Sequence, residues 1–214
     1  MYAEQKSPAK PGGPRQRLAE ALAAIRAYAD AKNVKISARR YGVDAMGAMA
    51  QGLFASLLIG TILNTAGTQL GLELLTQMGG FASSVAGPAM AVSIGFALNA
   101  PALVLFSLIT VGQAANSLGG AGGPLAVLVI AILACEAGKL VSKETKVDIL
   151  VTPLVTIFTG TALALWWAPA IGRAASAVGT VIMWATEQQP FVMGIVVSVI
   201  IGVALTLPIS SAAI

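Results

Sequence analysis

The chain has 214 residues, of which 57% are hydrophobic and 10% are charged, with a formal net charge of +4 and no histidine. Its mean hydropathy of +0.83 excludes an ordinary soluble domain, in which about 25% of residues are charged. The composition predicts an integral membrane protein, and we expect an all-α fold, a polytopic bundle of transmembrane helices.

The first 40 residues form a basic segment with no apolar core, so we expect no cleavable signal peptide. They hold nine of the 13 Lys and Arg residues and three acids. By the positive-inside rule this charge keeps the N-terminus in the cytoplasm. It favours anionic lipid over nucleic acid as a partner. Leu18, Leu22, Ile25 and Tyr28 recur at helical spacing, which predicts either an amphipathic helix on the cytoplasmic face or a solvated helix.

The first predicted span runs from about Asp44 to Leu63. Small residues recur along it at every fourth position, which predicts close packing on another helix, within a protomer or across a dimer. The polar segment 65–80 predicts a short interfacial or re-entrant helix on the far side. A second span is expected from Phe81 to Leu98.

Asn99, Ala100 and Pro101 predict a break after the second span. A third apolar segment follows from Ala102 to about Gln113. The glycine-rich run 119–123 lacks the Lys-Ser/Thr of a phosphate-binding loop, so it predicts a turn. A fourth span at 125–141 ends at a cluster of lysines, which returns the chain to the cytoplasm.

The chain then repeats its beginning. Val147-Asp148 matches Val43-Asp44, and Gly160-Thr161 matches Gly60-Thr61. The expected span at 149–167, a separate segment at 169–189 and a final span that breaks at Pro208 follow in the same order. We therefore expect a basic tail with an amphipathic helix at 1–40, a first membrane repeat at 41–146 and an incomplete second repeat at 147–214. The two repeats should be parallel, related by an axis along the membrane normal.

Most of the acidic residues lie near predicted span ends. Asp44 and Asp148 are expected to begin helices and to stabilise them through the helix dipole. Glu136 and Lys139 are expected to form an i,i+3 ion pair.

The candidate substrate-binding residues are polar groups near the breaks and loops. They would bind the hydroxyls of a polar solute, or they only restore hydrogen bonds to interrupted backbone. Glu187 is either a substrate-facing acid or an ordinary interfacial acid. We expect no catalytic residue, metal site or cofactor, because histidine is absent and Cys135 lies in an apolar run. The candidates are Glu187, Gln188, Asn99, Thr206, Ser210, Ser211, Gln113 and Asn116.

Two stretches resemble a known family. KVDILVTPLVTIFTGTALALWWAPAIGRAAS, from Lys146, and GIVVSVIIGVALTLPISSAAI, at the end of the chain, resemble the membrane-embedded EIIC component of sugar phosphotransferase systems. The resemblance covers about Tyr41 to Ile214, is closest to the stand-alone IIC domains and is more distant to the fructose-type permeases. By that resemblance Glu187 lies near the position of a substrate-facing acid.

The resemblance implies a homodimeric permease in the cell inner membrane. It would move a sugar or related polyol in a phosphoenolpyruvate-dependent system, while a cytoplasmic IIB protein, supplied by IIA, phosphorylates the solute. The alternatives are an orphan membrane transporter or sensor with no phosphorylation coupling, and a purely structural membrane scaffold. Whether the chain takes part in enzyme chemistry stays open at this point.

Overall fold

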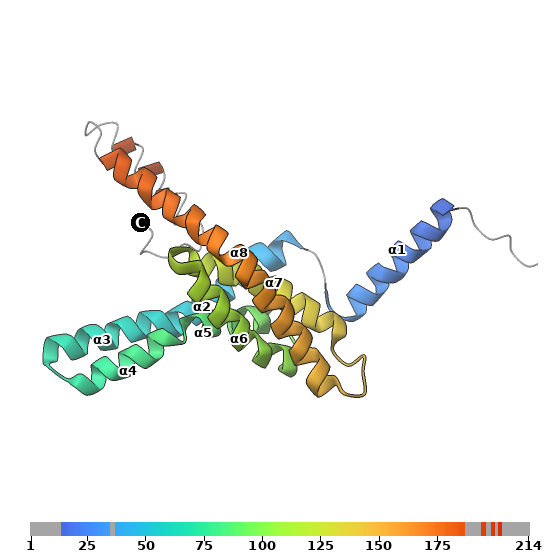
Figure 1. Cartoon of the computed structure of the whole chain (residues 1–214), viewed down its shortest axis with the longest axis horizontal. Coiled ribbons are helices and arrows are strands. Elements are labelled where there is room, and N and C mark those ends of the chain that lie inside the picture. The colour runs from blue at the N-terminus through green and yellow to red at the C-terminus, as the bar shows by residue number, and fades with distance from the viewer. Residues whose placement is uncertain (1–13, 35–36, 187–193, 196–197, 200, 203–214) are drawn as a thin grey trace, which may run out of the picture. The chain divides into compact units, whose positions relative to one another are not determined.

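The computed structural model describes residues 14–34, 37–186, 194–195, 198–199 and 201–202 (Figure 1). In these residues every regular element is a helix, which confirms the all-α prediction. Three helical stretches among them are long and apolar enough to cross a membrane, and a bent helix pair counts as a fourth if it forms one span. The chain separates into one unit up to Lys35 and a second from Ile36 onward.

The first unit contains α1 (Pro14–Ala31). The predicted helix is therefore present, and its row of Leu18, Leu22 and Ile25 is exposed. After α1, the Lys32 ammonium group lies 5.7 Å from the centre of the Tyr28 ring. An exposed row fits both alternatives, an amphipathic helix on the cytoplasmic face and a solvated helix.

The second unit begins with a continuous helix from Arg40 to Leu70. It consists of a π-helical turn η1 (Arg40–Asp44), α2 (Ala45–Leu53), a second π-helical segment η2 (Phe54–Leu58) and α3 (Ile59–Leu70). The prediction that Asp44 begins the helix is wrong, because the backbone is already helical at Arg39. The helix ends at Gly71, whose φ of 65° is left-handed and suits glycine.

The chain returns through α4 (Glu73–Ser84) and α5 (Ala86–Ala97), which are bent by 48° at the break between them. The predicted interfacial helix at 65–80 is not a separate element, since residues 65–70 extend the first helix and α4 begins at Glu73. Close packing of small residues holds the two extended helices together. A Cβ added at Gly79 would lie 2.5 Å from the Gly60 carbonyl oxygen. Figure 1 shows α3 and α4 as a two-helix arm that projects from the other helices.

The next two helices form a hairpin. α6 (Ala102–Gly119) and α7 (Gly123–Val141) are joined by the short 3-10 turn η3 (Gly120–Gly122). Gly120 has φ 50° and ψ −124°, a conformation that glycine adopts without strain. A Cβ at Gly138 would lie 3.0 Å from the Val104 side chain. The apolar stretch 102–141 therefore doubles back on itself at the predicted glycine turn.

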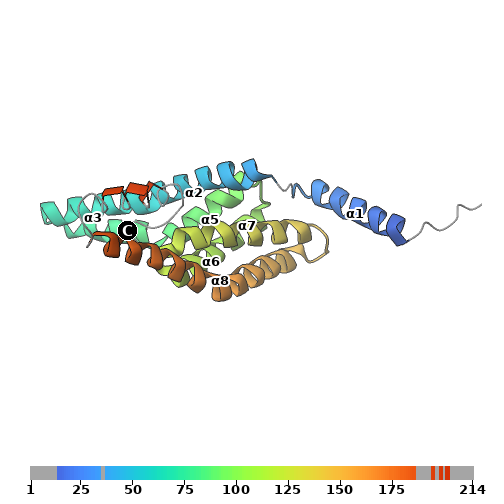
Figure 2. The ribbon, with the colours of Figure 1, turned by 90° about the horizontal axis from the view of Figure 1, so that it is seen from above.

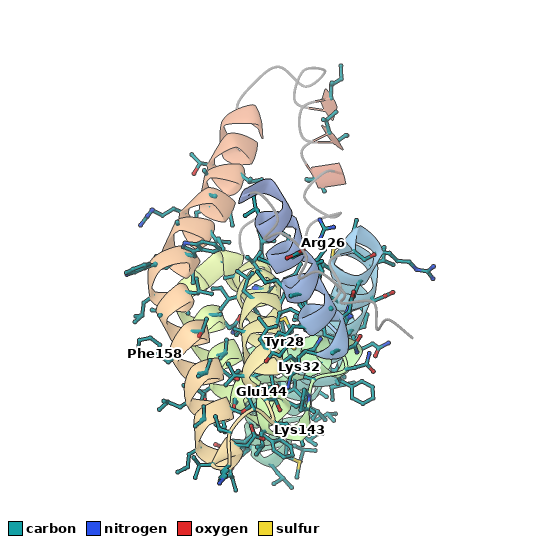
Figure 3. The ribbon with its side chains drawn as sticks, turned by 90° about the vertical axis from the view of Figure 1, so that its right-hand side faces the viewer. Arg26, Tyr28, Lys32, Lys143, Glu144 and Phe158 are labelled. Atoms are coloured by element: carbon teal, nitrogen blue, oxygen red, sulfur yellow. The ribbon has the colours of Figure 1, made fainter. Side chains whose placement is uncertain are left out.

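α8 (Asp148–Thr186) is an unbroken helix of 39 residues that contains Pro153 and Pro169. The prediction of a span that ends at Trp167, followed by a separate segment, is therefore wrong. The helix continues because its packing continues: Ala168 is buried, and a Cβ at Gly172 would meet the Gly119 carbonyl oxygen. Phe158 projects away from the neighbouring helices (Figure 3), as a lipid-facing side chain would.

The helices of the second unit form a bundle with α2 on one side and α8 on the other. α5, α6 and α7 lie between them (Figure 2). Buried apolar side chains of the three middle helices, such as Met90, Leu108 and Ile130, make the core. We call the end that holds Arg40, Leu98 and Lys139 the charged end, and the end that holds Gly119–Gly122 the turn end.

Asp148 begins α8 at the charged end, as predicted, and its carboxylate is a local cap. Oδ1 accepts hydrogen bonds from the Lys143 backbone N–H at 2.8 Å and from the Thr152 hydroxyl at 2.5 Å. We predict that Asp148→Ala lowers the free energy of unfolding by about 1 kcal/mol, because these acceptors and the favourable charge at the N-terminus are lost. Thermal unfolding in detergent measures this, with Lys146→Ala as the exposed control. An Asp148→Ala variant as stable as the control would contradict the capping role.

Candidate functional site

The predicted break at Asn99-Ala100-Pro101 is present, and it ends α5 at the charged end. The Ala100 N–H donates to the Gly95 carbonyl oxygen at 2.9 Å, and the Asn99 N–H donates to that of Phe96 at 3.0 Å. Asn99 has φ 55°, so the turn is a Schellman motif with asparagine in the left-handed position. Pro101 then sets the start of α6. This backbone pattern gives Asn99 a structural role, while its side chain stays exposed.

The Leu98 carbonyl oxygen at this break accepts hydrogen bonds from two cations. Arg40 Nη2 donates to it at 2.6 Å, and Lys139 Nζ donates to it at 3.1 Å. The two side chains come from the first helix and from α7, so they join three helices at one backbone atom. Positive charge is favourable there, because the last carbonyl groups of a helix carry partial negative charge.

Glu136 supplies the negative charge of this cluster. Its Oε2 lies 3.0 Å from Lys139 Nζ, which confirms the predicted i,i+3 ion pair. The contact between Lys139 Nζ and Glu136 Oε2 is an ion pair without the alignment of a hydrogen bond. Oε1 accepts a hydrogen bond from the Tyr41 hydroxyl at 3.1 Å. Both charged side chains are buried, so the removal of either one would leave the other as an uncompensated buried charge.

A cleft of about 610 Å³ opens beside the break, between the first helix and α5. Its size is in the range of small-molecule sites, roughly 300–1,000 Å³. Three polar side chains, those of Asp44, Gln51 and Ser93, line it among apolar and small residues. The lining residues are Val43, Asp44, Gly47, Ala48, Gln51, Val92, Ser93, Phe96, Ala97 and Leu105.

The chemistry of this cleft suits a hydroxylated solute. The Asp44 carboxylate accepts hydrogen bonds, and the Gln51 amide both donates and accepts. The Ser93 hydroxyl already donates to the Ala89 carbonyl oxygen at 2.9 Å, so its oxygen remains an acceptor. Phe96 provides an apolar wall. An ionisable group that faces a cleft in a membrane helix is a candidate for a functional residue.

Three of the substrate-binding candidates from the sequence fall within the described residues, and they lie at two opposite ends of the bundle. Asn99 is at the charged end, two residues after the cleft-lining Ala97. Gln113 and Asn116 lie near the other end of α6, where the Gln113 amide donates to the Ser117 hydroxyl at 3.3 Å. Asn116 packs between Gly87 and Gly123. The structure therefore does not bring these two residues together with Asn99. The remaining candidates, which lie outside the described residues, are Glu187, Gln188, Thr206, Ser210 and Ser211.

Sequence reasoning misses the cleft. It interprets Asp44 as a helix start, although this residue lies inside the helix and lines the cleft. The seven-residue spacing from Asp44 to Gln51 is the available signal, because it places two polar side chains on one helical face. Ser93 has no comparable signal, since only the antiparallel packing of α2 and α5 brings it to the same cleft.

A helical membrane bundle with a polar cleft beside a helix break is an architecture that membrane transport proteins use. The family model "Phosphotransferase system, EIIC" matches residues 43–214. The chain therefore belongs to this family. No curated protein and no solved structure matches it.

Membership of the family establishes the general function. The chain is a membrane-embedded permease component of the phosphotransferase system, in which EIIC domains work with sugar substrates and with IIA and IIB partners. The apolar helices agree with a location in a membrane.

Proposed function

We propose that this permease component binds a sugar or related polyol in the cleft beside the Leu98–Pro101 break and presents it for phosphorylation. Phosphoenolpyruvate would supply the phosphoryl group through IIA and IIB. The observation that carries the proposal is the set of three polar groups, from Asp44, Gln51 and Ser93, in one cleft of suitable size.

The charged end is proposed to face the cytoplasm. Every Lys and Arg other than Arg173 falls within residues 1–40 or 139–146, and positive charge is retained on the cytoplasmic side. Asp44 lies one helical turn from Arg40, so the cleft would open close to the cytoplasmic surface. A IIB protein would meet the solute at that surface, in the cell inner membrane.

The second half of the site is proposed to come from the second repeat. In the parallel arrangement of 41–146 and 147–214, the break near Pro208 would face the one at Pro101. Gln113 and Asn116 would act elsewhere on the solute's path, since they lie towards the turn end. A homodimer is the proposed assembly. Asn99 would lie beside the solute, opposite groups drawn from Glu187, Gln188, Thr206, Ser210 and Ser211.

We predict that Asp44→Asn weakens solute binding about tenfold, because a charge-assisted hydrogen bond becomes a neutral one. Gly47→Leu should prevent binding without unfolding the protein. A Cβ at Gly47 meets nothing within 4 Å, so the larger side chain fills the cleft instead of displacing a helix. The measurement is a thermal-shift screen of the detergent-purified chain over sugars, polyols and their phosphates, followed by titration of the best solute.

Glu73→Gln is the matched control, since it changes an exposed acid on the arm rather than in the cleft. Unchanged affinity in both Asp44→Asn and Gly47→Leu would reject the cleft as the site. Uptake by proteoliposomes then tests the coupling. Solute that accumulates as its phosphate only with phosphoenolpyruvate, IIA and IIB supports the proposal, and uptake of the unmodified solute supports the uncoupled transporter.

A further inference from the structure

In the sequence, Arg173 is separated from all other basic residues of the chain. It is the only Lys or Arg after Lys146, and it lies on α8 at the turn end of the bundle. Within the part of the chain that the structure describes, its guanidinium group has no ion-pair or hydrogen-bond partner. A cation at membrane depth is costly unless water or an anionic group accompanies it.

A groove of about 530 Å³ runs beside Arg173, between α8 and the turn that joins α6 to α7. Ser176 and Thr180 follow Arg173 at three and seven residues, so all three side chains lie on one face of α8. They line the groove, and Gly119 and Gly120 line its other wall. The Thr180 hydroxyl donates to the Ser176 carbonyl oxygen at 3.2 Å. The groove thus combines one guanidinium group with two hydroxyl groups.

The packing places this groove near the membrane surface. α7 has 19 residues, which is about 28 Å of helix and close to the thickness of the hydrocarbon core. If α7 spans the hydrocarbon core, its two ends lie near the two surfaces, and Gly123 is at the turn end. Gly172 packs on Gly119 at the same level. The exposed Trp166 lies about two helical turns before Arg173, where an aromatic belt is expected.

We propose that this groove binds the phosphate group of an anionic phospholipid. The guanidinium group presents paired N–H donors that match phosphate oxygens, and the Ser176 hydroxyl supplies a further donor. We assign the phosphate group to a lipid because of the position of the groove. Exposed apolar side chains of α8, such as Leu165, continue from the groove towards the membrane centre. The acyl chains of the bound lipid would lie along them. This site is at the opposite end of the bundle from the solute cleft.

The test uses the full chain in a mild detergent, titrated with dioctanoyl-phosphatidylglycerol and followed by thermal shift. Wild-type protein should be stabilised by this lipid and much less by dioctanoyl-phosphatidylcholine, whose headgroup is neutral overall. Arg173→Gln should weaken the phosphatidylglycerol Kd about tenfold. The phosphatidylglycerol Kd of Arg173→Lys should lie between those of wild type and Arg173→Gln, because the lysine ammonium group keeps the charge but lacks the paired N–H donors. Lys146→Gln, an exposed lysine at the charged end, is the matched control and should bind like wild type.

The melting temperature without lipid should be the same for Arg173→Gln and wild type, because Arg173 has no partner among the described residues. An equal phosphatidylglycerol affinity in Arg173→Gln and wild type would overturn the proposal. Inorganic phosphate that stabilises the protein as strongly, and with the same dependence on Arg173, would overturn the assignment to lipid.

Discussion

Gly79→Ala is expected to destabilise the arm of α3 and α4, whereas Gly80→Ala is expected to stabilise it. A Cβ at Gly79 would lie 2.5 Å from the Gly60 carbonyl oxygen and 2.6 Å from the Asn64 backbone nitrogen. Backbone atoms cannot rotate away, so the helices must separate, at a cost of about 1–3 kcal/mol. At Gly80 a Cβ meets nothing within 4 Å, and alanine favours the helix by up to about 1 kcal/mol.

The measurement is the unfolding free energy of the two variants in detergent, and the opposite signs are the decisive result. The comparison is closely matched, because the two glycines are neighbours on one helix and receive the same methyl group. Gly79→Leu should enlarge the loss, since a longer side chain separates the helices further. Equal effects at the two positions would mean that the arm is not packed as described. The close packing predicted for the first helix is therefore tested within one protomer.

Lys139→Met is expected to lower the free energy of unfolding by about 3–5 kcal/mol, a larger loss than that expected for Gly79→Ala. The substitution leaves the Glu136 carboxylate buried without its cation, although Arg40 still binds the Leu98 carbonyl oxygen. A Glu136→Met, Lys139→Met double variant should recover part of the loss, because no buried charge of this pair then remains.

A double-mutant cycle on thermal or denaturant unfolding measures the coupling between the two side chains. Lys146→Met is the control, since Lys146 is exposed at the same end, and it should change stability by less than about 0.5 kcal/mol. Additive losses in the double variant would show that the two buried groups act independently. That result would contradict the role given to the ion pair.

The sequence predicts those features that depend on neighbouring residues. The Glu136–Lys139 pair is a spacing of three on one helix, and the break at Asn99 follows from an asparagine placed two residues before a proline. The glycine turn at 119–123 is predictable for the same local reason. The helix ends are less predictable, because packing on distant residues decides them.

Two errors illustrate this limit. The predicted span ends at Trp167 and a separate segment begins at Pro169, but Ala168 and Gly172 pack on neighbouring helices and the helix continues. The polar groups at 65–80 predict an interfacial helix, whereas glycines on both helices of the arm extend the packing past them. Only one wall of the cleft could be predicted, from the spacing of Asp44 and Gln51, because Ser93 is brought to them only by the antiparallel pairing of α2 and α5.

The π-helical segment Phe54–Leu58 sets the rotational register of the first helix. In an α-helix a spacing of four residues advances by about 40° around the axis, so the steps from Gly52 through Ser56 to Gly60 would drift by about 80°. The wider π-helical turn cancels most of this drift, and all three residues stay buried. Loss of one residue from this segment would rotate α3 by about 100° relative to α2. The direction of the arm therefore depends on the number of residues in the helix as well as on its glycines.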